Sequence, residues 1–335
     1  MIDLRHFVDQ VEAIVRGHQL DTPGSFRRWN ESPNHPGRPG GVNPYGCADA
    51  ANLLYTIDRF PREAGERTGF TNALRALQSA DTGLFHEETH HPIHTTAHCL
   101  AALELFDAGP AVPLRGLADL REPDAMRSFL AGLDWRGDPW RASHRGAGLY
   151  AALVIAGEAG LDWQDAYFAW LWDNTDPATG LLAGRDLQPV AHGDTLSMVP
   201  HMAGTFHYLF NMQYARRPSR FPEKLVDTCL AMLADGRFPL GESIGFAEID
   251  WIYCTSRSLR QCGHRLPEAN AAIERLGHRL ASFVLSLDPA TDDALNDLHG
   301  LFGTMCAFAE LQQARPGFVR TTRPLRLVLD RRPFI

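Results

Sequence analysis

The sequence predicts an all-α fold in which six helical hairpins close into one ring, an (α/α)6 toroid. The main observation is a helical segment that begins with a polar or aromatic residue, is rich in small residues, and recurs at spacings of 49, 50, 57, 49 and 49 residues. The leading residues are Tyr45, His94, His144, His201, Asp250 and His299, and each is followed nine residues later by Leu or Phe. A near-constant period is the signature of repeated units. One hairpin cannot bury its apolar face alone, so the repeats are expected to stack and close.

The helical elements follow in order along the chain. Apolar residues at helical spacing predict a first helix over 3–17, and a long loop rich in Pro and Gly precedes a second helix that starts at Pro44. Amphipathic outer helices are predicted near 63–79, 122–133, 163–173, 222–234 and 268–286. Inner helices rich in small residues are predicted near 94–108, 145–159, 197–215, 249–262 and 295–313. Residues 1–335 therefore form one domain. Its tail, 318–335, alternates apolar and polar residues from Pro324, which predicts a short strand across the outside.

Composition excludes several classes of function. The net charge of −8 gives no electrostatic basis for binding nucleic acid or an anionic membrane. No apolar run approaches the roughly 20 residues of a membrane span. The first residues lack the basic start and apolar core of a signal peptide, so we expect a cytoplasmic protein. The six cysteines include no C-x-x-C pair, and the oligomeric state does not follow from the sequence.

The pattern also predicts where a functional site lies. The long polar loops all precede inner helices, so they emerge at the end of the ring where the inner helices begin. Helix N-termini present free N–H groups and partial positive charge, which favour anionic or hydroxyl-rich ligands. We therefore expect the six leading residues to surround the mouth of one pocket.

Acid–base chemistry on a carbohydrate is the first hypothesis for this pocket. The candidate catalytic residues are Asp49, His94, His144, Asp194, His201, Glu248 and Asp250. Glycoside cleavage needs one protonated and one ionised carboxyl group on either side of the bond. Asp49 lies one turn inside its helix between small residues, so burial is expected to raise its pKa and suit it to a general acid.

Aromatic and basic residues near the mouth predict the contacts to a saccharide substrate. The candidate binding residues are Tyr45, Trp140, Arg145, Trp251, Tyr253 and His299. Flat rings with polar tips are common in ligand pockets. Arg145 can bind a carboxylate with two hydrogen bonds, so a uronate lyase is an alternative to a glycoside hydrolase.

A metal-dependent enzyme is a further hypothesis. His94 and His98 are four residues apart and share a helix face, and His144 begins the next inner helix, so these three are the candidate ligands of a divalent metal. No cysteine pair supports the site, and no cofactor is required by the sequence.

Two stretches carry a resemblance to known toroids. The pattern Asp81-Thr-Gly-Leu-Phe, eight residues, then His94-Thr-Thr-Ala is similar to the loop and inner helix of six-hairpin α/α toroid proteins, and 176–182 echoes it. That superfamily includes six-hairpin glycosidases and polysaccharide lyases, and the resemblance implies a carbohydrate-active hydrolase or lyase. Terpenoid cyclase and prenyltransferase toroids look similar too, but 291–293 lacks the first Asp of an Asp-x-Asp-Asp motif, and Asp250 and Cys254 have the wrong spacing for the prenyltransferase zinc site. A non-catalytic ligand-binding toroid is also consistent with the sequence.

Overall fold

The structure, a computed structural model, describes all residues except 33–34, 183, 185–186, 193–194, 237–239 and 335. Most of these residues are helical, which confirms the all-α prediction. The inner layer consists of α2 (Pro44–Thr56), α4 (Pro92–Glu104), α6 (Pro139–Ile155), α8 (Val199–Tyr214), α10 (Ala247–Cys262) and α12 (Leu298–Ala314). The outer layer consists of α1 (Arg5–Gly17), α3 (Ala64–Ala76), α5 (Pro123–Ala131), α7 (Leu161–Asp173), α9 (Pro222–Asp235) and α11 (Leu266–Ser286). Shorter elements are the 3-10 helices η1 (Arg115–Arg121) and η2 (Asp293–Asn296), α13 (Val328–Arg331), and the strands β1 (Ile2–Asp3), β2 (Val190–His192), β3 (Thr195–Ser197) and β4 (Val319–Arg320).

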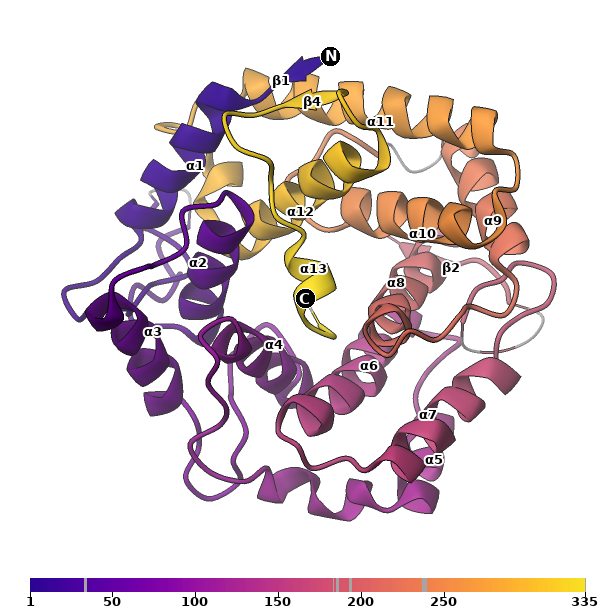
Figure 1. Ribbon diagram of the computed structural model, residues 1–335, viewed down its shortest axis with the longest axis horizontal. Coiled ribbons are helices and arrows are strands. Elements are labelled where there is room, and N and C mark those ends of the chain that lie inside the picture. The colour runs from indigo at the N-terminus through magenta and orange to yellow at the C-terminus, as the bar shows by residue number, and fades with distance from the viewer. Residues whose placement is uncertain (33–34, 183, 185–186, 193–194, 237–239, 335) are drawn as a thin grey trace.

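The inner helices form a closed ring. Each of them contacts the next one along the chain, and α12 contacts α2 to complete the circle. The outer helices lie around this ring (Figure 1). Residues 93–103 of α4 are all buried, as expected for a helix packed on every side, and the other inner helices are nearly as buried. None of the described helices has both the length and the apolar character that crossing a membrane requires.

Local sequence signals define the beginnings of the inner helices. Proline occupies the first turn of α2, α4, α6 and α8, where its missing N–H breaks no helical hydrogen bond. The Asn43 side chain caps α2 by accepting a hydrogen bond from the N–H of Tyr45 at 2.8 Å. The Asp297 carboxylate caps α12 by accepting from the N–H of His299 at 3.0 Å. These caps fix the helix ends from which the site residues project.

Glycine allows two close approaches of the backbone next to these helix starts. A Cβ atom on Gly46 would lie 2.5 Å from the carbonyl carbon of Arg27, so the segment that carries Arg28 lies directly on the first turn of α2. A Cβ on Gly303 would lie 2.5 Å from the carbonyl oxygen of Gly245, next to Phe246 at the start of α10. Both contacts bring residues of the pocket inward.

The C-terminal tail differs from its prediction. A strand does form, but it is β4, which pairs in parallel with β1 so that Ile2 lies opposite Val319. The alternating stretch from Pro324 is not a strand; it contains α13 and ends near the centre of the ring (Figure 1). The expectation was wrong because Val328, Leu329 and Phe334 are buried by the inner helices instead of lying along a sheet.

Candidate functional site

One cavity lies at the end of the ring where the inner helices begin. Its volume is about 230 Å³. The lining residues are Arg28, His90, His94, Trp140, His144, His207, Phe246, Asp297, His299 and Gly300. A larger cavity of about 820 Å³ lies between α1 and residues 288–296, but His18 is the only histidine in its described lining. The concentration of imidazoles makes the smaller cavity the candidate site.

Three of these histidines converge from successive inner helices. His94 lies on α4, His144 on α6 and His207 on α8, and each offers a ligand atom within 4.8 Å of the others. The ring centroids of His94 and His144 are 4.3 Å apart, and those of His144 and His207 are 4.9 Å apart. Three imidazoles that line one cavity can hold a transition-metal ion and leave further coordination positions open. We refer to these residues as the three-histidine cluster.

Hydrogen bonds orient two members of the cluster. Nδ1–H of His207 donates to the carbonyl oxygen of Ala203 at 3.0 Å and lies 3.0 Å from the Ser143 hydroxyl, which leaves Nε2 available. Nδ1 of His94 is hydrogen-bonded to the Tyr45 hydroxyl. In the tautomer with its proton on Nδ1, His94 donates to the Tyr45 oxygen and keeps a lone pair on Nε2. Metal-binding histidines are held in this manner by a partner on their other nitrogen.

His94 and His207 are buried and His144 is partly exposed, and the pKa of all three imidazoles is lowered. Burial lowers the pKa of both His94 and His144 well below the usual value, and neighbouring imidazoles lower it further. Burial also lowers the pKa of His207, to about 3. Neutral imidazole is the form that binds a metal, so the cluster does not have to lose protons near neutral pH before it can bind one.

A second group of residues lies beside this cluster. His98 donates from Nε2 to one oxygen of Asp49 at 2.7 Å, and His299 donates from Nδ1 to the other at 3.1 Å. Burial by itself would raise the pKa of Asp49, but the charges and hydrogen bonds of the two histidines outweigh it and hold the pKa well below its usual range. This lowered pKa contradicts the expected rise, so it gives no support to Asp49 as a protonated general acid. Asp49 instead fixes the orientation of His299, which lines the cavity.

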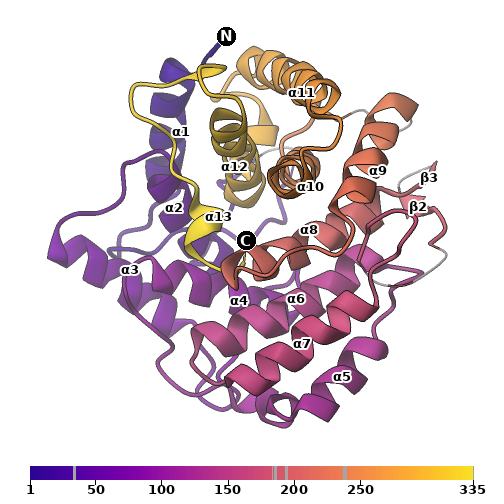
Figure 2. The same cartoon turned by 45° about the vertical axis from the view of Figure 1, so that its right-hand side comes forward.

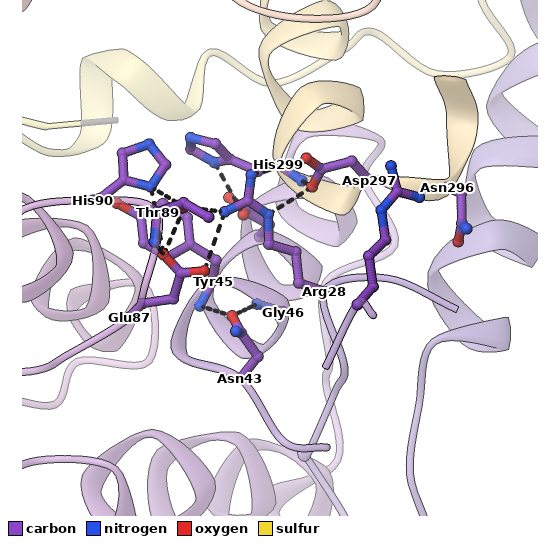
Figure 3. A network of polar contacts seen from close by, with 12 residues as sticks. Arg28, Asn43, Tyr45, Gly46, Glu87, Thr89, His90, Asn296, Asp297 and His299 are labelled. Carbon is purple, nitrogen blue, oxygen red and sulfur yellow. Dashed lines mark hydrogen bonds and ion pairs between the residues drawn. The ribbon is translucent and has the colours of Figure 1, made fainter. Parts of the chain in front are cut away.

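A polar network fixes the rim of the cavity (Figure 3). The Arg28 guanidinium donates to both carboxylate oxygens of Asp297 at 2.8 Å and to the Thr89 hydroxyl at 2.7 Å. Thr89 is in turn hydrogen-bonded to Nδ1 of His90 at 2.6 Å, and Glu87 accepts from the Thr89 hydroxyl at 2.6 Å. Arg28 is thus committed to protein partners, and it links the first loop to the starts of α4 and α12.

The structure brings part of the predicted site together. His94, Trp140, His144 and His299 line the cavity as expected. Tyr45 was expected to contact substrate, but it is fully buried behind His94, where its ring stacks on His90 and His98 at 4.5 and 4.8 Å between centroids. His98 was paired with His94 as a ligand by helical spacing, but its Nε2 is bonded to Asp49.

Several polar candidates lie away from the cavity. His201 is buried at the start of α8, and its Nε2 lies 3.0 Å from the carbonyl oxygen of Gln188. Glu248 accepts hydrogen bonds from the N–H of Gly241 and the hydroxyl of Ser243, so it organises the loop before α10. Asp250 is fully buried among packed helices, and burial raises its pKa well above the usual value. None of these three residues is in the described lining of the cavity, so their catalytic roles stay predictions. A position at a helix start does not by itself place a side chain on the face that meets the cavity.

The remaining candidates have structural surroundings. The Arg145 guanidinium lies 5.3 Å from the centroid of the Phe129 ring, and Arg145 is absent from the described lining of the cavity. Trp251 donates from its indole to the carbonyl oxygen of Cys229 at 2.8 Å, in the core toward α9. The Tyr253 ring packs against Phe206 at 5.4 Å between centroids. None of Arg145, Trp251 and Tyr253 is in the described lining of the cavity, so their substrate-binding roles stay predictions, and Asp194 lies outside the described residues.

Six lining residues were not among the candidate site residues: Arg28, His90, His207, Phe246, Asp297 and Gly300. His207 lies more than two turns inside α8, between Phe206 and Tyr208, and so escaped a search restricted to helix starts. A titratable side chain inside an otherwise apolar helix is the signal that could have identified it. Arg28 and Phe246 come from loops, and no periodicity points to them.

Comparisons with protein-family models, curated protein sequences and solved structures found no match to the chain. The class of protein therefore has to be argued from the fold and from the cavity.

Proposed function

We propose that this protein is a six-hairpin α/α toroid enzyme that uses a divalent metal ion at the three-histidine cluster to act on a small, hydroxyl-rich substrate. The observation that carries the proposal is the convergence of His94, His144 and His207 from three successive inner helices on one cavity. The toroid assignment is supported by the closed contacts from α2 through α12 and back.

The residues fit a metal ion in their chemistry. Three neutral imidazoles suit Zn²⁺ and other late first-row metals, whereas Mg²⁺ and Ca²⁺ prefer oxygen ligands. Tyr45 holds His94 and Ala203 holds His207 through Nδ1, so Nε2 of each ring would remain for a metal ion. A bound ion of this kind polarises a substrate oxygen or lowers the pKa of a water ligand to about 7.

The other cavity residues have roles consistent with hydrolysis or elimination. His299 is held by Asp49, and burial lowers its pKa to about 4, so its Nε2 is a proton acceptor near neutral pH. Trp140 offers a flat apolar surface for a sugar ring. A cavity of about 230 Å³ is smaller than a usual drug-sized pocket, which supports a monosaccharide-sized substrate unit. We therefore propose a carbohydrate hydrolase or lyase that binds a saccharide. We also propose a cytoplasmic location.

A mechanism that uses two carboxylates receives less support. Among the described lining residues Asp297 is the only carboxylate, and it is paired with Arg28 at 2.8 Å. Cleavage by two carboxyl groups needs a second one about 5–10 Å away across the same cavity. Glu248 and Asp250, the predicted partners, are absent from that lining.

Metal binding by two matched variants tests the proposal. After dialysis against a chelator, Zn²⁺ binding is measured by calorimetry for the wild type, His207→Ala and His201→Ala. Both histidines are buried on α8, but only His207 lines the cavity. We expect the wild type and His201→Ala to bind one equivalent of Zn²⁺. His207→Ala should lose more than about 100-fold in Zn²⁺ affinity, because the loss of a metal ligand costs more than the loss of a group that is hydrogen-bonded to a ligand.

Absence of binding in the wild type, or equal binding by the two variants, would overturn the metal site. Turnover is then measured with the metal-loaded wild type on small glycosides and uronides. Metal binding without turnover of any of them would instead favour a binding protein.

A further inference from the structure

The last described part of the chain, residues 325–334, lies inside the ring. After β4, the tail runs along the outside and then turns toward the centre, where α13 lies among the inner helices (Figures 1 and 2). Val328, Leu329, Arg332 and Phe334 are all buried. A terminal segment normally frays unless specific contacts hold it.

Three inner helices hold this tail. The N–H of Arg326 donates to the carbonyl oxygen of Thr56 on α2 at 2.8 Å. Asn211 on α8 donates from its side chain to the carbonyl oxygen of Pro333 at 2.7 Å, and Arg257 on α10 pairs with Asp330 at 2.6 Å. All three helix partners lie in the C-terminal halves of their helices, whereas the cavity lies at the N-terminal end. The tail therefore occupies the opposite end of the ring.

Phe334, the last described residue, contacts the three-histidine cluster from the end of the ring opposite the cavity. The Phe334 ring meets His94 edge to face, with centroids 4.8 Å apart and planes at 73°. The centroid of the Phe334 ring also lies 6.0 Å from that of His207, and the Phe210 ring packs beside both Phe334 and His207. Packing of this kind limits rotation of an imidazole about its Cα–Cβ and Cβ–Cγ bonds. A hydrogen bond at Nδ1 alone does not prevent that rotation.

We propose that the tail, residues 325–334, contributes one residue, Phe334, to the active site. It closes the far end of the ring, and Phe334 is a positioning residue that sets the angles of His94 and His207 toward a shared metal. This inference rests on the proposed metal site. It also narrows the substrate class, because a cavity closed from below receives a free small sugar or the terminal unit of a chain and does not accommodate a polymer threaded through the ring.

The first test measures metal affinity in tail variants. Calorimetry with Zn²⁺ compares the wild type with Phe334→Ala, Phe334→Tyr and Leu329→Ala. Leu329 is a matched control because it is buried in the same tail but has no ring contact with the cluster. We expect Phe334→Ala to lose about 10–100-fold in affinity, Phe334→Tyr to recover most of it, and Leu329→Ala to stay within about 3-fold of wild type while its melting temperature falls. Equal affinities in Phe334→Ala and Leu329→Ala would overturn the positioning role.

A second test does not depend on the metal. Diethyl pyrocarbonate acylates neutral imidazoles, and mass spectrometry gives the modification rate of each histidine in metal-free protein. Phe334→Ala should speed modification of His94 and His207, because reagent then also reaches them from below, and leave His299 unchanged. An unchanged rate at His94 would refute closure of the ring by the tail. If the wild type binds no Zn²⁺ but these rates change as expected, the metal proposal fails while the closure by the tail stands.

Discussion

Tyr45→Phe offers a direct test of how the cluster is oriented. The substitution removes only the hydroxyl that holds Nδ1 of His94, while the ring can still stack on His90 and His98. It leaves a buried N–H of His94 without an acceptor, which is unfavourable. Loss of such a partner weakens metal binding by about 10–100-fold, or about 1.4–2.7 kcal/mol. The three proposed ligands themselves are unchanged.

The consequence is measurable as a thermal shift. At Zn²⁺ concentrations 100 times the wild-type Kd, binding stabilises the folded state by about 2.7 kcal/mol. For 335 residues the unfolding entropy is about 0.7 kcal/mol/K, so the wild type should gain about 4 °C. Tyr45→Phe should gain only about 0.5–2 °C at the same concentration. Tyr150→Phe is the control, because its hydroxyl bonds to Gln164 on α7, and it should keep the full shift. A full shift in Tyr45→Phe would refute the role assigned to this hydroxyl.

Three further predictions concern the scaffold. Burial and the charge of Glu248 raise the pKa of Asp250, so the folded state keeps a proton that the unfolded chain releases. The free energy of unfolding of the wild type should therefore fall by up to about 1.4 kcal/mol per pH unit as the pH rises above the pKa of Asp250 in the unfolded chain. Asp250→Asn should not show this loss. If urea unfolding between pH 5 and 8 gives the same pH dependence for both proteins, the prediction is contradicted. Glu310→Gln removes the charge that pairs with the buried Arg257 at 2.6 Å, and urea unfolding should show a loss of about 3 kcal/mol. Gly46→Ala places a Cβ 2.5 Å from a backbone carbon, so calorimetric melting should reveal a loss of about 1–3 kcal/mol, and an unchanged melting temperature would argue against that close approach.

The helices were predictable because their signals are local. Outer helix α7, for example, was expected over 163–173 and spans Leu161–Asp173. Apolar spacing, first-turn prolines and capping residues act within a few positions of one another, so they can be read without knowledge of the fold. The end of the ring that carries the cavity also followed, because every inner helix begins there.

The composition of the site was only partly predictable. A constant spacing selects a position along each helix, but the tilt and rotation of that helix decide which side chain meets the cavity. On α8 the residue that lines the cavity is His207, while His201 is bonded to a loop carbonyl. The state of Asp49 depends on His98 and His299, which lie 49 and 250 residues away in the chain. Such distant pairings leave no trace in local pattern.

The contact between α12 and α2 has a consequence for how the protein is made. The two helices are separated by more than two hundred residues, and the tail follows α12 in the chain. Domains begin to fold from the N-terminus during synthesis, and contacts between distant segments form late. A nascent chain thus carries all three cluster histidines, within residues 92–214, well before α12 can contact α2 and before the tail can pack at the far end of the ring. We therefore expect the cavity to be complete only after α12 and residues 325–334 have been made, and not when the histidines have been made.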